Sequence, residues 1–127
     1  MIVVDASAAV AALLHDGDAR LQLSENRLAA PHLVDAEVLQ TMRKLLHRGT
    51  MTSHDAEQAI HLWTRLGVER FPITGLSTRI WSLRNNISAY DASYIALAEA
   101  LNCSLLTADA RLSTAPGPNC PITVLPR

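Results

Sequence analysis

The sequence has only two cysteines in 127 residues, Cys103 and Cys120, and their spacing fits no metal-binding or redox motif. We therefore expect two reduced thiols in a cytoplasmic protein. No apolar stretch approaches the ~20 residues that a membrane-spanning helix needs. A signal peptide is not expected either, because Asp5 interrupts the apolar start of the chain and no basic segment precedes it.

Lysine is almost absent, since Lys44 is the only one among eleven basic residues. A phosphate-receiver domain of similar length needs a lysine at the end of a late strand, whereas Lys44 lies in the middle of a predicted helix. The chain also has no HExxH motif, although His54, Asp55, Glu57 and His61 lie close together. Such a cluster is typical of a solvated helix face, so a zinc-protease site is disfavoured. The position of Lys44 likewise disfavours a receiver domain.

Short apolar runs alternate along the chain with longer amphipathic segments, which predicts alternating strands and helices. Strands are expected at residues 2–4, 26–30, 68–73, 103–107 and 122–125, and helices at 7–14, 32–48, 53–66, 76–83 and 90–101. Ser53 is expected to cap the helix that it begins. This order predicts an α/β fold with a central parallel sheet and helices on both faces, built by a single domain over residues 1–127.

Four acidic residues are candidates for a functional site. In a parallel sheet the ligand crevice lies beyond the carboxyl ends of the strands. Asp5 directly follows the first predicted strand and Asp109 follows the strand at 103–107, so both should emerge at the same edge of the sheet. Asp91 begins the helix that leads into that strand, and Glu37 lies early in the helix after Pro31.

An ordinary structural interpretation of these acids stays open. Asp5 and Asp91 both begin an Asp-Ala-Ser triplet ahead of a helical segment, and aspartate is a good helix N-cap. Glu37 could belong to a solvated polar stripe. Several carboxylates at one edge would, however, repel each other unless a cation lay among them, and oxygen ligands favour Mg²⁺ or Mn²⁺ over zinc.

The charge is unevenly distributed, although the net charge is only −1. Residues 41–90 hold seven basic groups against three acidic ones, whereas the remainder of the chain holds four against nine. A basic region beside an acidic site suits a phosphate-bearing ligand. Arg43, Lys44, Arg48 and Arg84 are therefore candidates for binding the phosphates of such a ligand. An arginine-rich composition also arises from a GC-rich genome, so the charge alone does not decide the matter.

Three segments resemble the PIN-domain ribonucleases, and most closely the VapC-like toxins of bacterial toxin–antitoxin pairs. They are the opening IVVDASA, the segment PHLVDAEV and the long run IWSLRNNISAYDASYIALAEALNCSLLTADARL. The resemblance covers essentially the whole chain and places the four family acids on Asp5, Glu37, Asp91 and Asp109. Gln40 departs from the pattern, because many relatives carry asparagine there, and the hydrogen bonding around Glu37 is therefore left open.

The resemblance implies a three-layer α/β/α sandwich, a homodimer, and hydrolysis of single-stranded or looped RNA with Mg²⁺, for which Mn²⁺ could substitute. Asp5, Glu37 and Asp91 would ligate the first ion, and Asp109 would complete the pocket or hold a second. Supporting positions of the family fall on Ser7, Thr107, Arg84 and Arg111. The partner would be a VapB-like antitoxin, whose tail would lie in a groove lined by Leu13, Leu14 and Val38.

Two other functions stay open at this stage. One is a PIN-fold protein-binding module that has lost catalytic activity, which the intact set of four acids disfavours. The other is a PIN nuclease that is not a toxin. Trp63 and Trp81 are expected in the core or in an interface, because both occur at apolar spacing.

Overall fold

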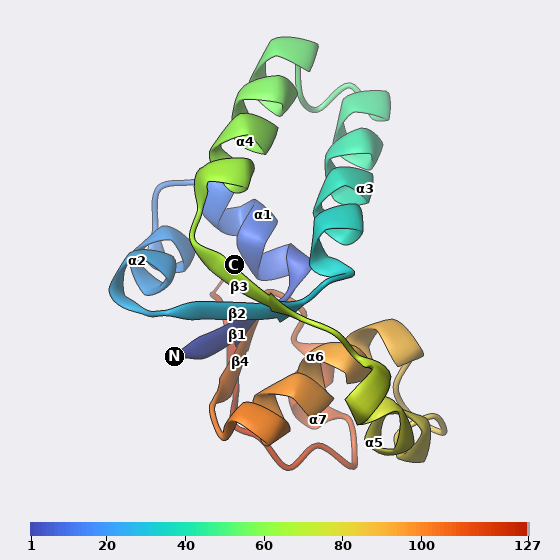
Figure 1. Ribbon diagram of the computed structural model, residues 1–127. Coiled ribbons are helices and arrows are strands. Elements are labelled where there is room, and N and C mark those ends of the chain that lie inside the picture. Colours follow the sequence, from blue (N-terminus) through green and yellow to red (C-terminus); the bar gives the residue numbers. More distant parts are fainter. Residues whose placement is uncertain (127) are drawn as a thin grey trace.

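The computed structural model describes residues 1–126, and its centre is a five-stranded sheet (Figure 1). Neighbouring strands are parallel throughout, in the order β3-β2-β1-β4-β5. The strands are β1 (Ile2–Val4), β2 (Leu28–Pro31), β3 (Val68–Phe71), β4 (Ser104–Thr107) and β5 (Ile122–Val124). The predicted parallel sheet is confirmed, with the first strand of the chain at its centre.

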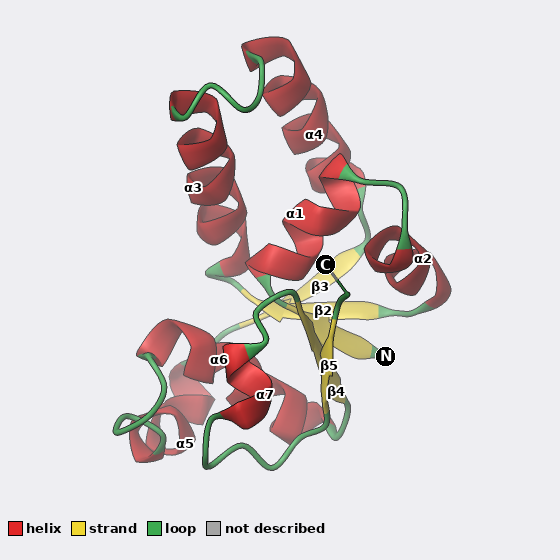
Figure 2. Cartoon of the chain, turned by 180° about the vertical axis from the view of Figure 1, so that it is seen from behind, coloured by secondary structure: helices red, strands yellow, loops and turns green. Residues whose placement is uncertain are grey.

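Helices cover both faces of the sheet, as views from the two sides show (Figures 1 and 2). One face carries α1 (Ala6–Leu14), α3 (Val34–His47) and α4 (Ser53–Arg65), with α2 (Asp18–Glu25) packed against α1. The other carries α5 (Ser77–Ser82), α6 (Ala89–Leu101) and α7 (Arg111–Thr114), and the short 3₁₀ helix η1 (Thr74–Leu76) leads into α5. The three-layer α/β/α sandwich is thus confirmed. None of the helices in residues 1–126 is long and apolar enough to cross a membrane.

Helix α6 is packed into the core on several sides. It contacts β1, β2 and β4 on one side and α5 on the other, and all of residues 92–98 are buried. Because a helix that is apolar on every side must be enclosed by protein, its sequence YIALAEAL suits this position. Helix α6 is therefore a rigid support for the polar residues of its first turns.

Several sequence predictions need correction. The sequence pattern misses helices α2 and α7, because α7 has only four residues and α2 buries only Ala19 and Leu23. Thr52, and not Ser53, caps α4 by accepting a hydrogen bond from the amide of Asp55. Trp81 is 67% exposed and is therefore not in the core, so that an interface remains its predicted position, whereas Trp63 is buried at 2%.

Pro31 belongs to β2, although the predicted strand stops before it. The amide of His32 donates to the carbonyl of Phe71 in β3. Because successive residues of a strand face opposite neighbours, the nitrogen of Pro31 faces β1. Pairing between β1 and β2 extends only to Ala29. The missing N–H of Pro31 therefore leaves no bond of the sheet unmade.

Candidate active site

Two of the predicted acids emerge from neighbouring strands. Asp5 follows β1 and Asp109 lies just beyond β4, and Val4 pairs with Leu106 in the parallel register. The amide of Asp5 donates to the carbonyl of Leu106 at 3.2 Å, which continues the pairing to the end of the sheet. Both acids therefore lie at the carboxyl edge, where parallel α/β sheets bind their ligands.

Asp5 is the most buried of the four acids, at 5% exposure. Its carboxylate accepts hydrogen bonds from the Ser7 hydroxyl at 2.6 Å, the Thr107 hydroxyl and the Ala8 amide at 2.9 Å. The last of these makes Asp5 the N-cap of α1. Ser7 also accepts from the Ala108 amide, at 2.9 Å. Capping and pocket formation are thus combined in Asp5, since the same carboxylate ties β1 to the end of β4.

Glu37 enters the same region from the first turn of α3. That turn is fixed from outside by Asp35, whose carboxylate accepts from the indole of Trp63 at 2.8 Å and from the guanidinium of Arg70 at 2.7 and 2.8 Å. Because Asp35 is bound to α4 and β3, it points away from the other acids. Glu37 instead accepts a hydrogen bond from the hydroxyl of Tyr94, on α6, at 2.5 Å.

The two Asp-Ala-Ser triplets occupy different positions in their helices. Asp5 precedes α1, whereas Asp91 is the third residue of α6, which is capped by Ser88. The Ser88 hydroxyl accepts from the Asp91 amide at 3.1 Å. The cap interpretation is therefore wrong for Asp91, and its carboxylate is left to the candidate pocket.

Asp109 lies at the rim of the acid group beside the basic side chain of Arg111. Arg111 binds its carboxylate through Nε at 3.0 Å and Nη2 at 2.8 Å, although the arginine side chain is 89% exposed. A surface pocket of about 460 Å³ adjoins this pair and is lined by Asn86, Ile87, Ser88, Asp91, Asp109, Arg111, Leu112 and Ala115. Arg84 precedes Asn86 in the sequence by two residues, and its guanidinium lies 4.7 Å from the centre of the Trp81 ring.

The electrostatics show that these acids form one group. Burial raises the pKa values of Asp5, Glu37 and Asp91 above their ordinary values. The charge of Asp91 raises the pKa values of Asp5 and Glu37 further. The charge of Asp109 likewise raises the pKa of Asp91. Hydrogen bonds from Ser7 and Thr107 act in the opposite direction on Asp5. Mutual repulsion of this kind is relieved by a cation among the carboxylates.

A divalent cation fits the donor chemistry of the group. The four carboxylates and the neighbouring hydroxyls are all oxygen donors, which suit Mg²⁺ or Mn²⁺. Within residues 1–126, however, no three acidic, histidine or cysteine side chains converge closely enough to hold one ion directly. Mg²⁺ usually keeps several of its waters. The spacing of the side chains is compatible with a cation, because carboxylates repel each other without one and ligands that bind through water need not converge.

The predicted RNA-binding residues lie apart from the acids. Arg43, Lys44 and Arg48 occupy the last turns of α3 and its C-cap, while Glu37 is in the first turn. At 1.5 Å per residue, they lie about 9–16 Å further along the helix axis. In Figure 1 this end of α3 points away from the sheet. They are not part of the acid group.

The comparisons with known proteins agree with this geometry. The chain matches the PIN domain over residues 2–118. It is 57% identical over 127 residues to Ribonuclease VapC9 of Mycobacterium tuberculosis (strain ATCC 25618 / H37Rv), covering 100% of both chains. Ribonuclease VapC1 of the same strain is 39% identical over 128 residues, covering 97% of this chain and 96% of that protein.

A solved structure of VapBC2 from Rickettsia felis, bound to a DNA fragment from their promoter, has the same fold. Its TM-score is 0.70 at 18% sequence identity, over 99% of this chain and 100% of that chain. With a family match that spans nearly the whole sequence, the chain belongs to the PIN-domain family. The predicted resemblance to its VapC-like members is confirmed.

Proposed function

We propose that the chain is an endoribonuclease toxin of a VapBC-like toxin–antitoxin pair, which hydrolyses RNA at the acid group with a divalent cation, Mg²⁺ or Mn²⁺. The observation that carries this proposal is that Asp5, Glu37, Asp91 and Asp109, from four separate segments, lie close enough together for their charges to raise one another's pKa values. The names of the VapC ribonuclease relatives support RNA as the substrate.

Each residue has a distinct part in the proposed reaction. Asp5, Glu37 and Asp91 would hold the cation, directly or through water, and Asp109 would complete the pocket or hold a second ion. When bound, the cation lowers the pKa of water and stabilises charge on the phosphate, so no protein nucleophile is required. Ser7 and Thr107 keep the Asp5 carboxylate in a fixed orientation. Arg111, exposed at the rim, can neutralise an RNA phosphate.

The metal requirement tests this proposal. We expect the purified protein to cleave a labelled single-stranded RNA in Mg²⁺ or Mn²⁺, to stop in excess EDTA, and to recover when either ion is restored. A matched incubation in Ca²⁺ controls for a nonspecific effect of divalent charge on the RNA. Cleavage that continues undiminished in EDTA would contradict the proposed role of the acids.

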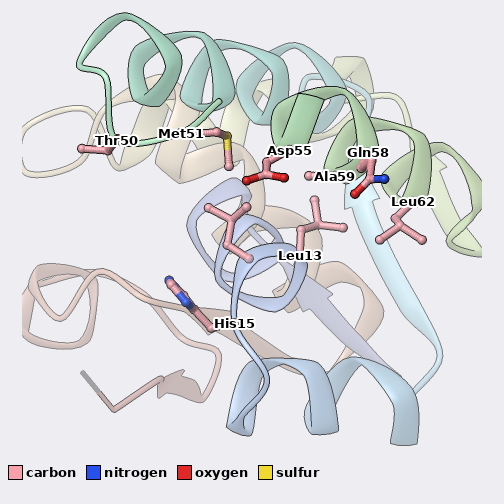
Figure 3. A pocket seen from close by; sticks show the side chains of 9 residues that line it. Leu13, His15, Thr50, Met51, Asp55, Gln58, Ala59 and Leu62 are labelled. Carbon is pink, nitrogen blue, oxygen red and sulfur yellow. The ribbon is translucent and has the colours of Figure 1, made fainter. Parts of the chain in front are cut away.

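The proposed antitoxin tail would lie in the groove between α1 and α4. Figure 3 shows Leu13 of α1 facing Ala59 and Leu62 of α4 across a pocket of about 360 Å³, which Leu14 and Met51 also line. Val38, predicted to line the same groove, is fully buried and therefore does not line this pocket. The open apolar side chains of Leu13 and Leu62 are suited to the apolar face of a short helix.

Expression of the toxin alone should arrest growth, and co-expression of the protein from the neighbouring gene should relieve it. Leu62 is 53% exposed, so Leu62→Glu should leave the fold intact but place an unpaired charge in the groove and abolish the relief. Leu21→Glu is the matched control, because Leu21 is 54% exposed on α2. Growth that recovers equally with both variants would exclude this groove. Absence of arrest by the wild type would favour a non-toxin PIN nuclease.

The proposed assembly is a homodimer.

The basic end of α3, together with Arg84, is proposed to guide RNA toward the acids. Reversing Arg43 and Arg48 to glutamate should flatten the salt dependence of RNA binding, by about 0.7 in logarithmic slope for each phosphate that the protein no longer neutralises. Arg27→Glu is the control, because Arg27 precedes β2 at the opposite edge of the sheet. A slope that stays unchanged in the double variant would rule out this path.

A further inference from the structure

Tyr94 has a position that the proposed function does not yet use. It is 1% exposed, and its hydroxyl donates to Oε1 of Glu37 at 2.5 Å across a separation of 57 residues. Tyr94 lies three residues after Asp91 on α6, so both side chains leave the same face of that helix. One buried helix thus presents both a candidate metal ligand and the hydroxyl that binds another.

The hydrogen bond joins the two helix layers at the acid group. Glu37 belongs to α3 and Tyr94 to α6, and these helices lie on opposite faces of the sheet (Figure 1). Within residues 1–126 it is the one side-chain hydrogen bond between α3 and α6. This contact therefore links Glu37 directly to the helix that carries Asp91.

Glu37 needs such a partner more than the other acids do. Its side chain has one more rotatable bond than an aspartate, so holding it in one rotamer costs more conformational entropy. Gln40, at the position where the family pattern has asparagine, is exposed and makes no hydrogen bond to Glu37. In the described part of the chain, the Tyr94 hydroxyl is the one donor to this carboxylate, and it occupies Oε1. The second oxygen, Oε2, is left for a cation.

We infer that Tyr94 is a positioning residue of the acid group: its hydroxyl holds the Glu37 carboxylate in the orientation that binds a divalent cation. This inference rests on the proposed function for the presence of the cation. Hydrogen-bond partners of metal ligands typically change metal affinity by about 10–100-fold when they are removed. Tyr94→Phe removes only the hydroxyl and keeps the buried ring, so the core should stay packed.

Mn²⁺ binding, measured by calorimetry on the full chain, tests the inference without reference to RNA cleavage. Tyr94→Phe should raise the dissociation constant for Mn²⁺ about tenfold or more. Tyr90→Phe is the matched control on the same helix, because Tyr90 is 66% exposed, and it should bind Mn²⁺ like the wild type. Unchanged far-UV circular dichroism would show that both variants are folded.

A double-mutant cycle with Glu37→Gln shows whether Tyr94 acts through Glu37. If it does, Tyr94→Phe should cause no further loss of Mn²⁺ affinity once Glu37 has been replaced. An equal loss in both backgrounds, or wild-type affinity in Tyr94→Phe, would overturn the positioning role while leaving the proposed nuclease intact. A wild-type protein that binds no Mn²⁺ would overturn both.

Discussion

Replacing Asp91 with asparagine is expected to lower the rate of RNA cleavage by about 100-fold or more, because a metal supplies several kcal/mol of transition-state stabilisation and each 1.36 kcal/mol is a factor of ten. Asparagine has nearly the same shape but no charge to offer a cation. Asp91 does not cap its helix, since Ser88 does, so the fold should be retained. Single-turnover cleavage of a labelled RNA, with circular dichroism of both proteins, measures the effect.

A matched control separates this effect from a general change in charge. Asp16 is exposed beyond the C-terminal end of α1, whereas Asp5 caps the N-terminal end of that helix, so Asp16→Asn should cleave RNA at the wild-type rate. An Asp91→Asn protein that keeps most of its activity would remove Asp91 from the catalytic group. If the wild type also fails to cleave RNA, the chain is better described as an inactive PIN-fold binding module.

The same substitution should raise the melting temperature of the metal-free protein near pH 7. Burial and the charge of Asp109 raise the pKa of Asp91 in the folded state. A raised pKa means that the favourable contribution is complete below the ordinary pKa and is lost as the pH rises through the folded-state pKa. At pH 7 the charged carboxylate therefore destabilises the metal-free fold, and asparagine removes that penalty.

Added Mg²⁺ or Mn²⁺ should reverse this order. A ligand that binds only the folded state stabilises it increasingly as its concentration exceeds the dissociation constant. The wild type should therefore gain more from the metal than Asp91→Asn does. In EDTA, the advantage of Asp91→Asn should shrink as the pH falls and Asp91 takes up its proton. Thermal melts in EDTA and at several metal concentrations measure both trends.

Asp109→Asn provides the internal comparison for these melts. The Asp109 carboxylate is already bound by the Arg111 guanidinium and by the Arg111 amide at 3.0 Å. Removing its charge also removes this ion pair, so the metal-free gain should be smaller than for Asp91. If Asp91→Asn melted with the wild type under every condition, Asp91 would carry no unfavourable charge and would not bind the metal.

The parallel sheet, though not the order of its strands, and the edge that carries Asp5 and Asp109 could be predicted from local patterns. Short apolar runs alternate with amphipathic segments, and a residue that follows a parallel strand must emerge at the carboxyl edge. Asp5 and Asp109 are therefore placed correctly by chain position alone. The sequence analysis did not distinguish the two Asp-Ala-Ser triplets. Ser88, three residues before Asp91, is the N-cap of α6, so Asp91 lies inside the first turn of its helix and not at the cap.

Contacts between distant residues could not be predicted from a single sequence. Tyr94 lies within an apolar stretch typical of core, and nothing nearby in the sequence marks Glu37 as its partner. The bonds of Asp35 to Trp63 and Arg70 also span 28 and 35 residues, yet they fix the helix that carries Glu37. Apolar spacing likewise could not show that Ile80 is the residue of α5 that is buried while the neighbouring Trp81 is exposed.

The ends of the RNA products test the proposed reaction most directly. A cation held by the acid group would supply an activated water that attacks the phosphate itself, so cleavage by the wild-type protein in Mg²⁺ should leave 5′-phosphate and 3′-hydroxyl ends. Attack by the neighbouring 2′-hydroxyl of the RNA would instead leave a 2′,3′-cyclic phosphate and a 5′-hydroxyl. Mass spectrometry of the products distinguishes the two. Cyclic phosphate ends would contradict a metal-activated water at Asp5, Glu37, Asp91 and Asp109.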